Sequence, residues 1–177
     1  MQTTSSQLGH VTPATLPHEQ APVPAIGDRE RVYLLPGQLH ATDRACQITT
    51  ILGSCIAVCL WDSKRRIGGM NHFLLPAWRK GEGASMRFGD LATRALFEKL
   101  LALGCQRRHI AAKIFGGAAL FQKEDRYETS LGAKNVAAVR TMMKNANIPI
   151  LAEDTGGNHG RKVVFHTDDG SVWSRQI

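Results

Sequence analysis

The sequence lacks any long hydrophobic run, and no apolar stretch approaches the ~20 residues that a membrane span requires. The first ten residues have neither a basic segment nor an apolar core, so they do not form a secretory signal. Aromatic residues make up only 6% of the chain, and no basic stripe interleaves with them, which argues against a nucleic-acid partner. We therefore expect a cytoplasmic protein with no membrane insertion and no bound nucleic acid.

Cysteine is also scarce. Cys46, Cys55, Cys59 and Cys105 are expected to be reduced thiols in a cytoplasmic chain of 177 residues, rather than a disulfide framework. Cys55 and Cys59 stand four positions apart in one predicted strand, which separates their thiols by about 13 Å. That distance is too long for the two thiols to share one ion, so a zinc site is disfavoured and no cofactor is expected.

Positive charge is in excess, with 22 Lys and Arg residues against 15 Asp and Glu residues. The segment 1–27 holds four of the seven prolines and no Lys or Arg, and it is rich in Ser, Thr and Gln. Such a segment cannot bury enough apolar surface to order itself, so we expect a disordered leader over 1–27 and one folded domain over 28–177. The basic domain favours an acidic partner surface.

Many short strands with two helices predict an α+β domain. Since two helices cannot cover both faces of every sheet, we expect mixed β-sheets packed on each other as a β-sandwich core, with the helices outside. The predicted helices cover 90–103 and 133–145. The predicted strands cover 31–35, 48–52, 55–61, 67–75, 110–115, 148–152, 163–165 and 171–174.

A hairpin reading brings Cys55 and His72 face to face. If Trp61 pairs with Arg66 across a four-residue turn, Cys55 lies directly opposite His72, with the two Cβ atoms about 5 Å apart. A thiol beside an imidazole is an activated nucleophile. A cysteine on an apolar strand is more often a small buried hydrophobe, and it is the pairing with His72 that favours catalysis. A slip of one residue would separate the two side chains.

Five sequence blocks in a fixed order resemble the CheD family of chemoreceptor glutamine deamidases. They cover Thr49–Leu60, Gly68–Pro76, Ala112–Ala118, Leu131–Val136 and Ala152–Asn158, the last followed by Gly160-Arg161. The resemblance implies a cysteine hydrolase fold shared with the cytotoxic necrotizing factor toxins. It also implies a catalytic Cys–His–Thr set, which corresponds to Cys55, His72 and Thr49.

The hairpin supports Cys55 and His72 independently, whereas Thr49 rests on the resemblance alone. On a straight strand Thr49 would lie about 20 Å from Cys55, so the chain must fold back near Gly53-Ser54 for it to reach His72. The adjacent Thr50 is the alternative if the local alignment is off by one residue.

The resemblance implies that the chain deamidates glutamine side chains of methyl-accepting chemotaxis receptors to glutamate through a Cys55 thioester, and that it hydrolyses glutamate methyl esters by the same route. It also implies a CheC phosphatase as a partner. Two alternatives stay open: a non-catalytic binding module that regulates a CheC-type phosphatase or a receptor, and a different thiol hydrolase such as a peptidase.

Overall fold

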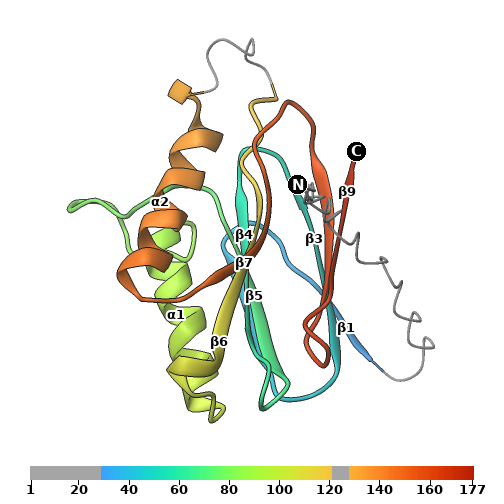
Figure 1. Cartoon of the computed structure of the whole chain (residues 1–177). Coiled ribbons are helices and arrows are strands. Elements are labelled where there is room, and N and C mark those ends of the chain that lie inside the picture. The colour runs from blue at the N-terminus through green and yellow to red at the C-terminus, as the bar shows by residue number, and fades with distance from the viewer. Residues whose placement is uncertain (1–28, 121–127) are drawn as a thin grey trace, which may run out of the picture.

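The structure, a computed structural model, describes residues 29–120 and 128–177, and it has three layers (Figure 1). Helices α1 (Gly89–Ala102) and α2 (Leu131–Asn145) form the first layer, a five-stranded sheet the second and a four-stranded sheet the third. The leader predicted over 1–27 lies outside the described residues. The expected α+β architecture, with packed sheets and the helices outside, is confirmed.

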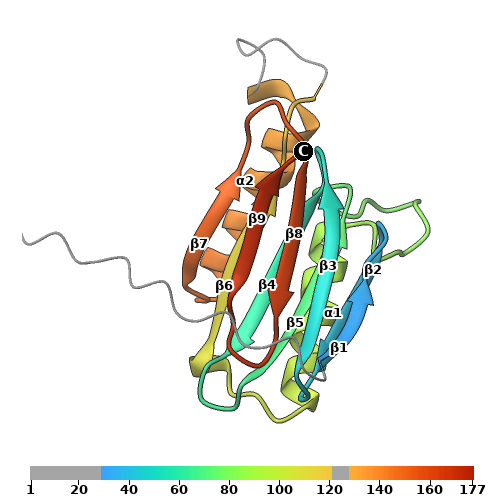
Figure 2. The same cartoon turned by 90° about the vertical axis from the view of Figure 1, so that its right-hand side faces the viewer.

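The first four strands alternate between the two sheets, and the later strands join them in two consecutive groups. The four-stranded sheet, seen face-on in Figure 2, has the order β1-β3-β8-β9 and contains β1 (Glu30–Tyr33), β3 (Cys46–Leu52), β8 (Arg161–His166) and β9 (Val172–Gln176). The five-stranded sheet has the order β2-β5-β4-β6-β7 and contains β2 (Gln38–Thr42), β5 (Ile67–Phe73), β4 (Ile56–Asp62), β6 (Ile110–Gly116) and β7 (Ile150–Thr155). A short 3₁₀ turn, η1 (Arg107–His109), precedes β6.

The five-stranded sheet is buried on both faces because helices cover one side and the other sheet covers the second. Its central strand β4 is accordingly an almost continuous apolar run, Ile-Ala-Val-Cys-Leu-Trp-Asp. Side chains from β4 alternate between two cores: Ile56, Val58 and Leu60 pack toward the helices, whereas Ala57 and Cys59 pack toward the four-stranded sheet. This alternation fixes which face each residue near the β3–β4 junction presents.

Helix α2 starts where Ser130 caps it, accepting a hydrogen bond of 3.0 Å from the Ala133 N–H. Its buried stripe includes Val136, Val139 and Met143, which pack onto the five-stranded sheet. None of the helices within 29–120 and 128–177 is long and apolar enough to cross a membrane.

Candidate functional site

The chain passes from one sheet to the other at residues 53–55, between β3 and β4, as the predicted bend requires. The carbonyl oxygens of all three bend residues accept hydrogen bonds from elsewhere in the fold. Gly53 accepts from the Ala118 N–H (2.9 Å) and Cys55 from the Gly117 N–H (2.8 Å). Ser54, between them, accepts from Asn135 Nδ2 (2.9 Å). The backbone beneath Cys55 is therefore held at every peptide.

A glycine is required beside this bend. Gly116, at the end of β6, has φ +107°, and a Cβ built on it would lie 2.2 Å from the carbonyl oxygen of Cys55. Only glycine permits that conformation together with that approach. Gly116 and Gly117 thus support the backbone of Cys55.

The β4–β5 hairpin has a different register from the predicted one. Asp62 pairs with Ile67, so His72 lies opposite Ala57 rather than opposite Cys55. The prediction that Trp61 pairs with Arg66 was wrong because Asp62 belongs to the strand: its buried carboxylate accepts hydrogen bonds from the first turn residues, Lys64 N (2.9 Å) and Arg65 N (3.1 Å).

The change in register is an even number of residues, and so Cys55 and His72 still share a face. Cys55, Ala57 and Met70 belong to the core between the two sheets, and His72 projects from the same side of β5 as Met70. Cys55 is diagonal to His72, and diagonal neighbours lie about 7–8 Å apart, within reach of a long side chain. No hydrogen bond joins His72 Nε2 to any described residue, the Cys55 thiol included.

A threonine from the opposite sheet orients His72, and it is Thr50. Its Oγ1 lies 2.9 Å from His72 Nδ1 and 2.8 Å from the carbonyl oxygen of Leu34. Because the Leu34 carbonyl can only accept, the hydroxyl proton of Thr50 goes to it, and Oγ1 then accepts a hydrogen bond from Nδ1–H. The neutral imidazole therefore carries its proton on Nδ1 and leaves Nε2 as a base.

The side chain of Thr49, the residue that the resemblance implies, is on the other face of β3. Side chains alternate along a strand, so only every second residue of β3 can face the core. Thr50 is fully buried, whereas Thr49 is half-buried, pairs with Tyr33 and Val164 and gives its carbonyl to the Leu34 N–H at 2.9 Å. The threonine in contact with His72 is therefore Thr50, the alternative that the sequence left open.

Burial shifts the pKa of both site residues toward their uncharged forms. His72 is 2% exposed, and burial lowers its pKa below 6.5 although the Leu34 carbonyl opposes the shift. Burial also raises the pKa of the Cys55 thiol, with partial compensation from its own backbone N–H. The resting pair is thus a neutral thiol and a neutral imidazole.

The other cysteines are buried hydrophobes. Cys46, Cys59 and Cys105 are all free and buried, and burial raises the pKa of the Cys46 and Cys105 thiols to about 11. Within residues 29–120 and 128–177, no cluster of three or more His, Cys, Asp or Glu side chains could hold a metal ion. Of the four thiols, Cys55 alone is partly exposed.

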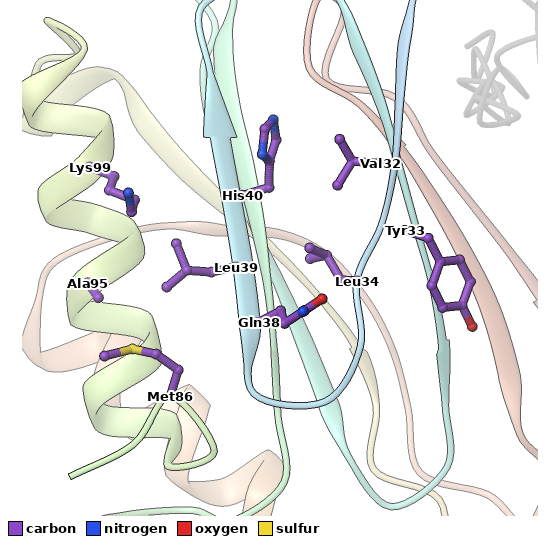
Figure 3. Close-up of a pocket in the computed structure, with 9 residues that line it drawn as sticks. All are labelled: Val32, Tyr33, Leu34, Gln38, Leu39, His40, Met86, Ala95 and Lys99. Atoms are coloured by element: carbon purple, nitrogen blue, oxygen red, sulfur yellow. The ribbon is translucent and has the colours of Figure 1, made fainter.

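Two cavities lie near the pair without containing it. A groove of about 500 Å³ opens between β1, β2 and α1 (Figure 3), lined by Val32, Tyr33, Leu34, Gln38, Leu39, His40, Met86, Ala95 and Lys99. A smaller pocket of about 190 Å³ lies against the residue before Cys55, lined by Ser54, Ala118, Ala119, Leu120, Ser130, Leu131 and Gly132. Only the smaller pocket touches the 53–55 bend.

Comparison with known proteins extends over most of the chain. The family model described as CheD chemotactic sensory transduction matches residues 74–176. The chain is 42% identical to the probable chemoreceptor glutamine deamidase CheD 1 of Anaeromyxobacter dehalogenans, over 94% of this chain and 98% of that protein. The chain belongs to the CheD family. CheD proteins named as probable chemoreceptor glutamine deamidases in Trichlorobacter lovleyi (42% identical, 80% of this chain, 88% of the relative) and Sulfurimonas denitrificans (40%, 84% and 95%) match it as well.

Proposed function

We propose that this CheD protein deamidates glutamine side chains of methyl-accepting chemotaxis receptors to glutamate, with Cys55 as the nucleophile. The observation that carries the proposal is the position of His72, which faces the core on the same side as Cys55 while Thr50 holds its Nδ1. The names of the relatives, probable chemoreceptor glutamine deamidases, supply the substrate class.

The reaction begins with proton transfer from the Cys55 thiol to His72 Nε2 as sulfur attacks the amide carbon of glutamine. The Cys55 backbone N–H is our candidate donor to the oxyanion. The tetrahedral intermediate then collapses, the C–N bond breaks, and His72 returns the proton to the departing ammonia. A thioester remains on Cys55.

Water completes the cycle. His72 Nε2 takes a proton from a water molecule, whose oxygen attacks the thioester carbon, and the C–S bond breaks to release glutamate and the thiol. A glutamate methyl ester gives the same thioester with methanol as the leaving group, so methylesterase activity follows from the same residues. Thr50 keeps Nε2 free for both steps because it holds the proton on Nδ1.

We place this activity in the cytoplasm, where the domains of chemoreceptors that carry modifiable glutamines lie, with a CheC phosphatase as a further partner. A non-catalytic module that binds a receptor or a CheC-type phosphatase is the second candidate. We favour catalysis because His72 Nδ1 is hydrogen-bonded whereas His72 Nε2 is buried without a partner among the described residues. An unpaired buried nitrogen lowers folding stability, and a binding module would gain nothing from it.

The test is incubation of the full chain with a purified chemoreceptor cytoplasmic fragment, followed by intact mass and peptide mapping. We expect glutamine-to-glutamate conversion at defined receptor positions, lost in Cys55→Ala and retained in Cys59→Ala, a matched change at a buried thiol. Receptor that binds the chain but stays unmodified would instead support the adaptor. Cleavage of the receptor chain would support a peptidase.

A further inference from the structure

Asn135 on helix α2 connects the segment just before β4 to the residue just after β5. Its side chain is completely buried, and its Nδ2 donates hydrogen bonds of 2.9 Å to two carbonyl oxygens, those of Ser54 and Leu74. Ser54 directly precedes Cys55, and Leu74 lies two residues after His72. One amide group therefore holds the backbone next to both the nucleophile and the base.

The orientation of the amide is unambiguous. Both partners are carbonyl oxygens, which only accept, so the NH₂ group must face them and both of its protons are used. The remaining oxygen, Oδ1, is buried and has no hydrogen-bond partner among the described residues. Burying an unpaired acceptor costs stability, so this asparagine is poorly explained by folding energy alone.

Holding the Ser54 carbonyl also sets the direction of the Cys55 N–H. In a planar trans peptide the C=O of one residue and the N–H of the next point in opposite directions. The hydrogen bond from Asn135 draws the Ser54 carbonyl toward α2 and so turns the Cys55 N–H away from α2. Cys55 itself packs against the core between the two sheets, on the side of the five-stranded sheet away from α2.

We propose that Asn135 is a positioning residue: it fixes the Ser54–Cys55 peptide so that the Cys55 N–H faces the oxyanion, and it sets the spacing between Cys55 and His72. The oxyanion part rests on the proposed deamidase function. The effect on the Cys55 thiol does not, because it concerns the geometry of the nucleophile whatever its substrate.

The experiment compares Asn135→Ala with Val139→Ala in the full-length chain. Val139 lies one turn further along α2, is fully buried and packs in the helix-facing core, so its truncation costs stability without touching residues 53–55. Three quantities are measured for each variant: the melting temperature, the pH dependence of Cys55 alkylation by iodoacetamide, and kcat and KM on the receptor fragment. Cys55→Ala gives the alkylation background.

For Asn135→Ala we expect kcat to fall about tenfold or more, with KM within twofold of the wild-type value. Removing one oxyanion-hole donor lowers kcat about 100- to 1,000-fold, and a donor that is displaced but still present should lower it less. We also expect the alkylation profile to move to higher pH. Val139→Ala should lower the melting temperature yet leave kcat and the profile unchanged. If the two variants reduce kcat in proportion to their loss of stability, or if Asn135→Ala keeps the wild-type profile, the positioning role is overturned.

Two further outcomes are separable. If the wild-type chain leaves every receptor glutamine intact, the deamidase assignment fails, while the alkylation profile still tests whether Asn135 acts on Cys55. If Asn135→Ala does not fold, Asn135→Ser replaces it. This variant keeps one hydroxyl donor, and we expect it to lie between wild type and the loss expected for Asn135→Ala in both kcat and profile. Wild-type behaviour of Asn135→Ser would reject the proposal.

Discussion

At the scale of single residues, two adjacent threonines give a direct test of the catalytic geometry. Thr50 faces the core and His72, whereas Thr49 lies on the opposite face of β3. We expect Thr50→Val to lower kcat about tenfold, because His72 then loses the acceptor that fixes its tautomer. A tenfold change in rate corresponds to ~1.4 kcal/mol, which is the energy of one neutral hydrogen bond. Thr49→Val should change kcat less than twofold. Receptor deamidation rates measure both, and the reverse ranking would restore Thr49 as the orienting residue.

Buried His72 also predicts the pH dependence. Since burial lowers its pKa below 6.5, the base form persists to lower pH than in a free histidine, and the acid limb of kcat/KM should have its midpoint below 6.5. The same shift makes the folding stability depend on pH. Near pH 6.5 the His72 imidazole takes up a proton in the unfolded chain but not in the folded chain, so the stability is full above that pH and falls below it.

Measuring kcat/KM on the receptor fragment from pH 5 to 8, alongside urea unfolding of the wild type and His72→Gln, checks both statements. We expect the wild type to lose more stability than His72→Gln as the pH falls through 6.5. An acid limb with its midpoint above 6.5 would show that the imidazole is stabilised as a cation, contrary to its burial.

At the scale of elements, the end of β6 sets the shape of the 53–55 bend that carries Cys55. Gly116→Ala would place a Cβ on the Cys55 carbonyl and impose a positive φ on alanine, so we expect roughly 2–4 kcal/mol of destabilisation and loss of activity. Gly83→Ala is the matched control, because a Cβ there meets no atom within 4 Å. Urea unfolding of both variants provides the comparison, and equal stabilities would show that the bend tolerates displacement.

The same elements show how far sequence patterns reach. Apolar runs and helical spacing predicted both helices and eight strands to within a few residues. Strand β2 was missed because Gln-Leu-His-Ala-Thr is a polar edge strand with only one fully buried residue. The hairpin register was wrong since the choice between Trp61 and Asp62 as the last strand residue depends on Asp62 accepting a third hydrogen bond, from the distant Gln106 N–H.

The candidate site was predicted to a similar degree. The side-chain period along two neighbouring strands was enough to put Cys55 and His72 on one face. Which threonine reaches His72 depends on how two sheets pack, which no local pattern contains. Asn135 lay in a recognised block, yet its role depends on α2 meeting the bend from 81 residues away.

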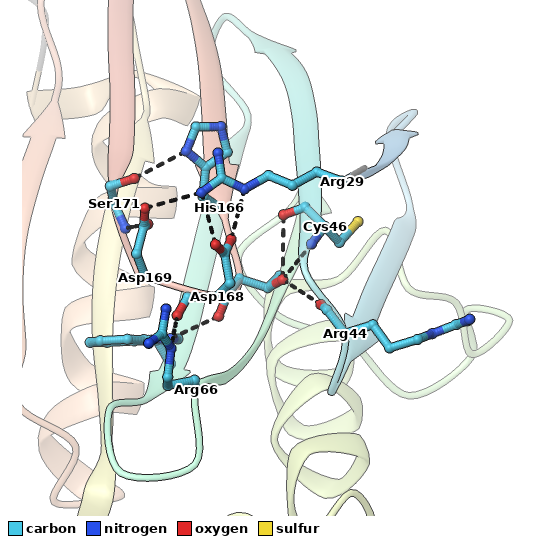
Figure 4. Close-up of polar contacts among 10 residues, drawn as sticks. Arg29, Arg44, Cys46, Arg66, His166, Asp168, Asp169 and Ser171 are labelled. Carbon is cyan, nitrogen blue, oxygen red and sulfur yellow. Dashed lines mark hydrogen bonds and ion pairs between the residues drawn. The ribbon is translucent and has the colours of Figure 1, made fainter. Parts of the chain in front are cut away.

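At the scale of the whole molecule, a charged cluster fastens the first described residue to the last hairpin (Figure 4). Arg29 donates two hydrogen bonds to Asp168, at 3.0 and 2.8 Å, in the turn between β8 and β9. Although burial raises the pKa of Asp168, the hydrogen bond and charge of Arg29 outweigh it and hold that pKa below 3.8. The pair therefore links the residue just before β1 to the turn between β8 and β9.

We expect Arg29→Ala to destabilise the fold by roughly 1–2 kcal/mol, because the two side chains are only 15% and 24% exposed. The difference from wild type should be present above pH 3.8 and disappear as the pH falls and Asp168 is protonated. Arg44→Ala is the control, since its pair with Glu30 spans 3.8 Å between side chains 80% and 48% exposed. Urea unfolding would contradict the expectation if both variants matched the wild type.

The layered arrangement has a consequence for when the proposed catalytic residues are aligned. His72 lies in the five-stranded sheet, Cys55 directly precedes its strand β4, and Thr50 lies in the other sheet, so His72 Nδ1 meets Thr50 only after the two sheets have docked. A newly made or partly opened chain carries Cys55 as an ordinary cysteine without an aligned imidazole. The proposed reactivity of Cys55 therefore depends on the docked sandwich and should be lost when the two sheets separate, even where each sheet keeps its backbone hydrogen bonds.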